Sequence, residues 1–115
     1  NATDFGDMNN FANGTGTASG SRGLFAGGFN SSYSDAIQYI TIDTTSNTSD
    51  FGDLLAYAMD PASCASETRA VFAGGLSSPS YTNSIQYVTI ATTGNGTDFG
   101  DMISTNYKQA GFSGD

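Results

Sequence analysis

Apolar residues come in short segments along the chain, separated by stretches rich in Gly, Ser, Thr and Asn. In the segment Ile85–Ile90, both faces of a strand would be largely apolar. A strand with one face in solvent alternates more cleanly between apolar and polar residues. We therefore expect this strand to be covered on both sides by neighbouring sheets. The segments Leu24–Ala26 and Val71–Ala73, each closed by a glycine pair, predict a second buried strand.

Two further strands complete the pattern. The sequence Asp-Phe-Gly-Asp predicts a short strand anchored by its Phe, and the stretch Met59–Glu67 predicts a weaker strand before the next Arg. No segment has a sustained helical period. The nearest, Leu54–Met59, is stopped by Pro61 and is too short to be stable as an isolated helix. The chain is therefore expected to be all-β.

The same elements recur at a nearly constant offset. The segment Arg22–Gly28 recurs at 69–75, an offset of 47, and Asp35–Ile42 recurs at 83–90, an offset of 48. Asp-Phe-Gly-Asp occurs three times, at 4–7, 50–53 and 98–101. The extra residue lies between the glycine pair and the Ile-Gln-Tyr strand. Because loops tolerate insertions, it predicts a hairpin connection there.

Four short antiparallel strands in a repeat of about 47 residues are the pattern of a β-propeller blade. We favour this fold over a β-solenoid, whose coils are about half as long or shorter. The strand phase predicts residues 1–8 as the last strand of a preceding blade, 9–55 and 56–103 as two complete blades, and 104–115 as the first strand of a following blade. Propellers close with roughly four to eight blades, so we expect part of a longer tandem array. Self-association of short chains into a ring or an open filament is the alternative.

The glycine pairs and the strands that follow them resemble the kelch repeat. Tyr39 and Tyr87 lie in the third strand, as a kelch Tyr does, and Phe51 and Phe99 stand where a kelch Trp anchors the fourth strand. The chain departs from the family in having no Trp and in a spacing of 12 positions from Tyr to Phe, longer than usual. We expect these residues to be structural parts of the blades: Gly27, Gly28, Gly74, Gly75, Tyr39, Tyr87, Phe5, Phe51, Phe99, Arg22 and Arg69.

The amino-acid sequence of residues 87–101, which is repeated in tandem along the chain, is similar to kelch-like arrays in virion structural and tail-fibre proteins of aquatic bacteriophages. The resemblance implies a non-catalytic structural and adhesive module of a virion fibre or surface appendage, extracellular or on the virion surface, which presents loops to a host glycan or protein. The alternative is an extracellular fibril-forming repeat protein of non-viral origin. The expected partners are other blades of the same longer chain, further copies by self-assembly, and the host surface.

The charge of the chain excludes two classes of partner. There are 3 Lys and Arg residues against 11 Asp and Glu, and the formal net charge is −8. A surface that follows nucleic-acid phosphates needs clustered Lys and Arg, so we expect neither nucleic acid nor an anionic membrane surface as a partner. No apolar run approaches the roughly 18 residues of a membrane-spanning helix.

Common catalytic groups are missing as well. The chain has no His and a single Cys, Cys64, which removes Ser/His and Cys/His catalysis, histidine metal ligands and an intrachain disulfide. Galactose oxidase, which has kelch-like blades, uses a copper site with two His, and this sequence has none. We expect no enzyme activity, no cofactor and no metal, and we expect Cys64 to be a small buried hydrophobe.

One pair of carboxylates recurs in each repeat: Asp4 and Asp7, Asp50 and Asp53, Asp98 and Asp101. Such pairs suggest a hard-cation site or the two carboxylates of a glycosidase. A calcium loop gathers more oxygen ligands than two, and an active site is used once, whereas these pairs recur in every repeat. We therefore expect the first Asp to cap a turn and the second to bond to loop amides.

Basic and aromatic residues are the next candidates for contacts. Arg22 and Arg69 begin the same strand in successive repeats. We expect their guanidinium groups to pair with an Asp-Phe-Gly-Asp segment rather than to bind an anion. Aromatic residues in or beside loops suit the recognition of sugars or protein surfaces, because they offer rigid contact area among adaptable polar groups. These residues are Phe29, Tyr33, Tyr81 and Tyr107.

The pattern Asn-x-Ser/Thr occurs five times. In a protein that passes through a eukaryotic secretory route, these Asn residues are exposed glycan acceptors. In a phage protein they are turn residues, which is the interpretation we favour. They are Asn1, Asn13, Asn30, Asn47 and Asn95.

Overall fold

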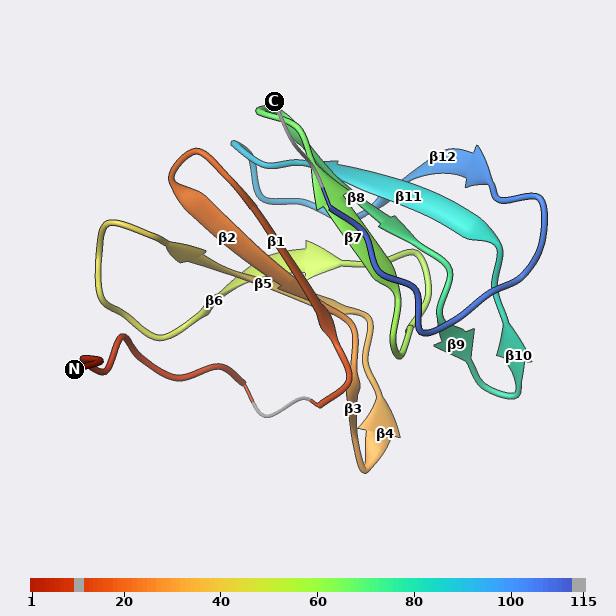
Figure 1. Cartoon of the computed structure of the whole chain (residues 1–115), viewed down its shortest axis with the longest axis horizontal. Coiled ribbons are helices and arrows are strands. Elements are labelled where there is room, and N and C mark those ends of the chain that lie inside the picture. The colour runs from red at the N-terminus through yellow and green to blue at the C-terminus, as the bar shows by residue number, and fades with distance from the viewer. Residues whose placement is uncertain (10–11, 113–115) are drawn as a thin grey trace.

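Two antiparallel sheets of four strands form the framework of the chain (Figure 1). The computed structural model describes residues 1–9 and 12–112. The first sheet, blade 1, contains β1 (Thr15–Ser19), β2 (Arg22–Ala26), β5 (Ala36–Thr41) and β6 (Ser49–Asp53), which neighbour one another in that order. The second sheet, blade 2, contains β7 (Ala62–Ala65), β8 (Arg69–Ala73), β11 (Ser84–Thr89) and β12 (Thr97–Asp101) in the matching order.

The predicted all-β fold, with about two complete four-stranded antiparallel blades, is confirmed. In the described part of the chain there is no helix long and apolar enough to cross a membrane. The two flanking segments predicted as orphan strands, 1–8 and 104–115, pair with neither sheet over their described residues. A strand in a sheet needs a ladder of backbone hydrogen bonds to a partner strand, and neither segment forms one within the described residues. The division at residues 8, 55 and 103 stays a prediction.

Both blades have the same register. Leu24 of β2 faces Tyr39 of β5, and Val71 of β8 faces Tyr87 of β11. The third and fourth strands shift register at the same repeat position in each blade. Gly52 lies at this bulge in blade 1 with a φ of +146°, a conformation that favours glycine. The glycine of Asp-Phe-Gly-Asp is therefore required by the backbone of the fourth strand.

Each glycine pair turns the chain out of the sheet at the end of the second strand. Small hairpins follow the pairs: β3 (Phe29–Asn30) with β4 (Ser32–Tyr33), and β9 (Leu76–Ser77) with β10 (Ser80–Tyr81). Gly27 has a φ of +68°, and a Cβ there would lie 2.4 Å from the carbonyl oxygen of Ala58. Both the turn and the approach of the next segment therefore require glycine. The predicted hairpin connections are confirmed.

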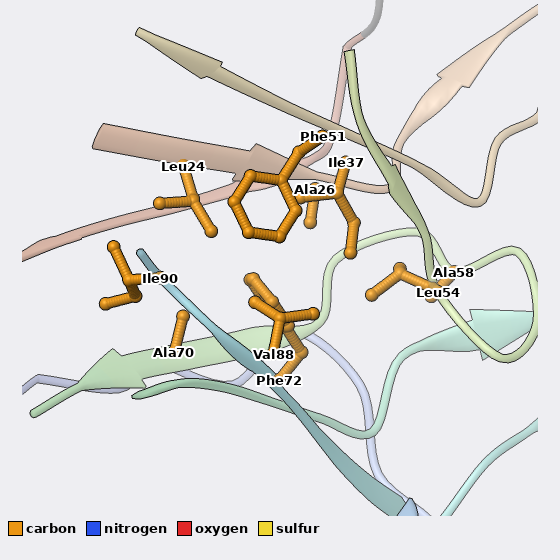
Figure 2. Packing of buried hydrophobic residues seen from close by; sticks show 10 residues of the cluster. All are labelled: Leu24, Ala26, Ile37, Phe51, Leu54, Ala58, Ala70, Phe72, Val88 and Ile90. Carbon is orange, nitrogen blue, oxygen red and sulfur yellow. The ribbon is translucent and has the colours of Figure 1, made fainter. Parts of the chain in front are cut away.

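The core lies between the two blades, and Figure 2 shows side chains from both sheets meeting there. The surface that blade 1 contributes is called its back face: Leu24, Ala26, Ile37, Tyr39 and Phe51. The opposing surface is the front face of blade 2: Ala70, Phe72, Gln86, Val88 and Ile90. Leu54 and Ala58 add to the core from the segment that joins the blades. This face-to-face packing buries one face of each sheet. The expectation that the strand at Ile85–Ile90 is covered by sheets on both sides is therefore met on one side alone within the described residues: Val88 and Ile90 are buried there, whereas Tyr87 on the other side is half-buried.

The Phe of Asp-Phe-Gly-Asp gives a matched test of this core. Phe51 is 2% exposed, whereas its repeat counterpart Phe99 is 58% exposed. In dilute solution, Phe51→Ala should lower the free energy of unfolding by about 3–5 kcal/mol, because it leaves a cavity in the core. Phe99→Ala should cost less than about 1 kcal/mol. Urea denaturation measures both values, and equal losses for the two variants would contradict the assignment of the core.

Candidate functional site

Aromatic side chains gather around the two small hairpins, a surface that we call the hairpin edge. In Figure 1 the β3–β4 and β9–β10 hairpins project beyond the sheets at the same end of the molecule. The rings of Phe29 and Tyr33 meet edge to face with centroids 5.2 Å apart, and Tyr33 stacks on Tyr57 at 5.8 Å. Tyr81 stacks on Tyr107 at 4.4 Å. Phe29, Tyr57, Tyr81 and Tyr107 are exposed.

Each tyrosine stack joins a hairpin to the segment that follows the fourth strand. Phe29 and Tyr33 face each other across the β3–β4 ladder. Tyr57 comes from the segment after β6, where the N–H of Ala58 donates to the carbonyl oxygen of Ser34 at 3.1 Å. At the second hairpin, the N–H of Asn106 donates in the same way to Thr82, at 3.4 Å. Backbone bonds of the fold therefore hold the rings in place.

Tyr57 is the member of this surface that the sequence does not predict. It does not occupy a repeated position, because Ala58 corresponds in its hydrogen bond to Asn106, and Thr105 therefore corresponds to Tyr57. The sequence offers one indication of its role: a tyrosine follows two of the three Asp-Phe-Gly-Asp copies within six residues, Tyr57 after the second and Tyr107 after the third. The four predicted aromatic residues do lie on the hairpin edge.

The stack at the second hairpin changes an ionisation. Hydrogen bonding to the Tyr107 phenol raises the pKa of Tyr81 above its ordinary value of 10.0, and repulsion between the two phenolates raises it further. The same contact that brings the two rings together therefore favours the neutral phenol of Tyr81.

The two strand-leading arginines lie on tyrosine rings. The guanidinium carbon of Arg22 is 4.8 Å from the ring centroid of Tyr39, and that of Arg69 is 4.4 Å from the ring of Tyr87. Arg22 Nη1 also donates to the carbonyl oxygen of Ile90 in blade 2, at 2.7 Å. The predicted pairing with Asp-Phe-Gly-Asp carboxylates is thus replaced by cation–π contacts, since a ring face within reach attracts a guanidinium.

The tyrosine under each arginine also meets the Phe of the fourth strand. Tyr39 and Phe51 are edge to face with centroids 5.8 Å apart, and Tyr87 and Phe99 repeat the arrangement at 6.0 Å. Arg, Tyr and Phe therefore form one cluster per blade. The cluster of blade 1 lies on its back face, and that of blade 2 lies on the corresponding face. All six residues were predicted to be structural parts of the blades.

The carboxylate pairs are placed by backbone bonds. Asp4 Oδ1 accepts from the N–H of Gly6 at 3.2 Å, which is the expected turn cap. The second Asp was expected to bond to loop amides, but among the described residues its backbone N–H forms the bond, to an Asn side chain: Asp7 donates to Asn47 Oδ1 at 2.9 Å, and Asp53 donates to Asn95 Oδ1 at 3.1 Å. Over residues 1–9 and 12–112, no three His, Cys, Asp or Glu side chains gather into a group suited to a metal.

The two asparagines of these bonds have a role that the sequence analysis missed. Asn47 and Asn95 occupy the same repeat position, and each accepts from the Asp-Phe-Gly-Asp segment of the preceding repeat. That recurrence is the indication available in the sequence. All five predicted acceptor positions are exposed: Asn1, Asn13, Asn30, Asn47 and Asn95. Cys64 lies on β7 opposite Val71 and is half-buried.

No family model and no curated protein matched the sequence when it was compared with them. The resemblance to kelch repeats and to phage fibre proteins therefore stays a prediction, and the surfaces described above carry the functional argument.

The tyrosine stack predicts a measurable titration. Tyr107→Phe removes both the hydrogen bond and the second phenolate, so the pKa of Tyr81 should fall toward 10.0. Phenolate absorbance during an alkaline titration measures the change. Tyr33→Phe, which also removes one phenol but leaves this stack intact, should keep the late-titrating group. Loss of that group in Tyr33→Phe and its retention in Tyr107→Phe would show that the stack is wrongly placed.

Proposed function

We propose that the chain is a non-catalytic structural and adhesive repeat module, of a virion fibre or surface appendage, that presents its hairpin edge to a host glycan. The observation that carries the proposal is the recurrence of exposed, stacked tyrosines at the same edge of two successive blades. Beneath them the strands are fixed by the buried core. The binding surface is thus preorganised, which lowers the entropic cost of association.

The chemistry of the hairpin edge suits neutral sugars. Aromatic rings offer flat apolar area to the C–H faces of a sugar, and the surrounding Ser, Asn and Gly residues supply hydrogen bonds. The loops that carry the rings contain Ser31, Ser32 and Asn30 at the first hairpin. The net charge of −8 repels anionic polysaccharides. A glycan is therefore favoured over an acidic ligand, and a host protein remains the other ligand class for the same surface.

A catalytic role has less support. The acidic side chains recur as a pair in each repeat, at positions whose backbones bond to the next repeat. A group that is used at every junction serves the architecture, whereas an active site is used once. This distribution supports a display module.

The second candidate is an extracellular fibril-forming repeat protein of non-viral origin. It is favoured by the face of each blade that the other blade does not cover within the described residues, because repeated face-to-face stacking extends in one direction. Electron microscopy separates the two candidates: appendages attached to particles favour the first, and continuous fibres without particles favour the second.

Binding to the hairpin edge can be tested with neutral oligosaccharides of galactose, mannose and N-acetylglucosamine, immobilised as an array. Tyr81→Ala should weaken binding of a captured sugar about tenfold, because the loss of one stacking ring costs roughly 1.4 kcal/mol. Phe99→Ala, which removes an exposed ring on the face of blade 2, is the control and should bind as the wild type does. Equal losses in the two variants, or no sugar captured at all, would contradict the proposal.

A further inference from the structure

Each blade has two apolar faces, and within the described residues the other blade covers only one face of each. The back face of blade 1 is buried against the front face of blade 2. The opposite surfaces occupy the same repeat positions: Val71, Ala73, Ile85, Tyr87 and Phe99 form the back face of blade 2, and Gly23, Phe25, Gln38, Ile40 and Ile42 form the front face of blade 1. Phe99 is 58% exposed where Phe51 is buried, and Ile42 is 41% exposed where Ile90 is buried.

The buried interface shows what a covering blade must provide. The N–H of Asp53 donates to Asn95 Oδ1, and the N–H of Gly96 returns a bond to the Asp53 carbonyl oxygen at 2.7 Å. The N–H of Leu55 donates to Oε1 of the buried Gln86, also at 2.7 Å. A fourth strand and the residues just after it therefore bind an Asn and a Gln of the next blade.

Residues 1–9 make the same set of bonds on the front face of blade 1. The N–H of Asp7 donates to Asn47, and the N–H of Thr48 donates to the Asp7 carbonyl oxygen at 2.9 Å. The N–H of Asn9 donates to Gln38 Oε1 at 3.0 Å. This segment thus occupies the place of the fourth strand of a neighbouring blade, although it brings none of that blade's second and third strands.

Residues 104–112 play the corresponding part at the other end. The N–H of Gly75 donates to the carbonyl oxygen of Asn106 at 2.9 Å, as the N–H of Gly28 donates to Ala58 at 2.7 Å. The N–H of Lys108 donates to the carbonyl oxygen of Asp60 at 3.2 Å. In Figure 1 the segment runs alongside β7. It therefore occupies the place where the next blade would begin.

Two positions on the back face of blade 2 lack the neighbours that their counterparts in blade 1 have. Gly100 has a φ of +141°, close to the +146° of Gly52, yet none of the described residues lies within 4 Å of a Cβ built on it. A Cβ on Gly52 would lie 2.4 Å from the carbonyl oxygen of Gly94. Arg69 rests on Tyr87 as Arg22 rests on Tyr39, but within the described residues it has no carbonyl partner like that of Arg22.

The front face of blade 1 is also hollowed. A cavity of about 300 Å³ opens there, with Met8, Phe25 and Gln38 among its lining. Phe72, the counterpart of Phe25 in blade 2, is 1% exposed because blade 1 packs over it. The hollow therefore marks the volume that a neighbouring back face would fill.

We propose that a second copy of this chain docks head to tail, so that its blade 1 front face covers the blade 2 back face of the first copy. Residues 1–9 of the second copy and 104–112 of the first are displaced, because each occupies a place that the other copy supplies. The buried interface specifies the new bonds: Asp101 N–H to Asn47, Ile103 N–H to Gln38, and Arg69 to the carbonyl oxygen of Ile42.

The exchange is favourable because the backbone bonds of the displaced segments are replaced by equivalent bonds, while apolar faces that were open to water become buried. Because the two docking faces differ, the contact is heterologous and repeats in a ring or a filament. The inference rests on the structural part of the proposed function. Displacement of residues 104–112 moves Tyr107 away from Tyr81, so at such a junction the first hairpin keeps the intact aromatic stack, that of Tyr33 and Tyr57.

Two variants test the assignment of faces in the full 115-residue chain. Ile42→Asp places a charge on the front face of blade 1, and Phe99→Asp places one on the back face of blade 2. Sedimentation velocity should show the wild-type mass rising above 11.8 kDa with concentration. Each variant alone should stay at 11.8 kDa. A mixture of the two should form a 1:1 complex of twice that mass, because each variant retains the face that the other has lost.

The controls separate this inference from the proposed adhesive function. Tyr81→Asp, on the hairpin edge, should associate as the wild type does, and Phe99→Asp should keep its sugar binding. Circular dichroism and urea denaturation verify that each variant is folded. A wild-type mass that stays at 11.8 kDa up to millimolar concentration, single variants that associate like the wild type, or a mixture that forms no complex would each overturn the proposal.

Discussion

One contact recurs at every junction between repeats: the Asp-Phe-Gly-Asp strand of one repeat lies against the loop that precedes the same strand in the next. Asp53 and Asn95 exchange bonds there with help from Gly96, and Asp7 and Asn47 do the same one repeat earlier. The glycine of the motif makes the approach feasible, because a Cβ on Gly52 would lie 2.4 Å from a carbonyl oxygen of the loop. This contact sets the distance and angle at which one blade stacks on the next.

The stacking geometry then accounts for the composition. The second and third strands carry apolar residues on both faces and leave little room for charged side chains, since an ionised group in a buried place needs a partner. The chain accordingly is 12% charged, and the Asp pairs of the two fourth strands lie at exposed positions. The basic residues that begin the second strands lie over tyrosine rings, where Arg22 also binds across the interface to Ile90. The side chains available for contacts with a ligand therefore lie in the loops, and the exposed aromatic rings among them gather at the hairpin edge.

The sequence was sufficient for features that are local or repeated. Glycine pairs, apolar strands and the inserted residue predicted the second strand, the third strand and the hairpin between them, because each depends on backbone preference and burial within one repeat. Contacts between repeats were harder to predict. The partner of Arg22 depends on which side chain lies beneath its guanidinium group in the folded chain. That side chain is the ring of Tyr39 rather than a carboxylate. The acceptor role of Asn95 and the position of Tyr57 also depend on how one blade lies against the next.

Hydrogen exchange at the Asp53 amide tests the junction most directly. Asn95→Ala removes the acceptor of this N–H while leaving the strand sequence intact. The amide should then exchange faster, and the free energy of unfolding should fall by about 1 kcal/mol. Asn30→Ala, at an exposed hairpin position, is the matched control and should change neither value. Unaltered exchange at Asp53 in Asn95→Ala would contradict the claim that this contact fixes one blade on the next.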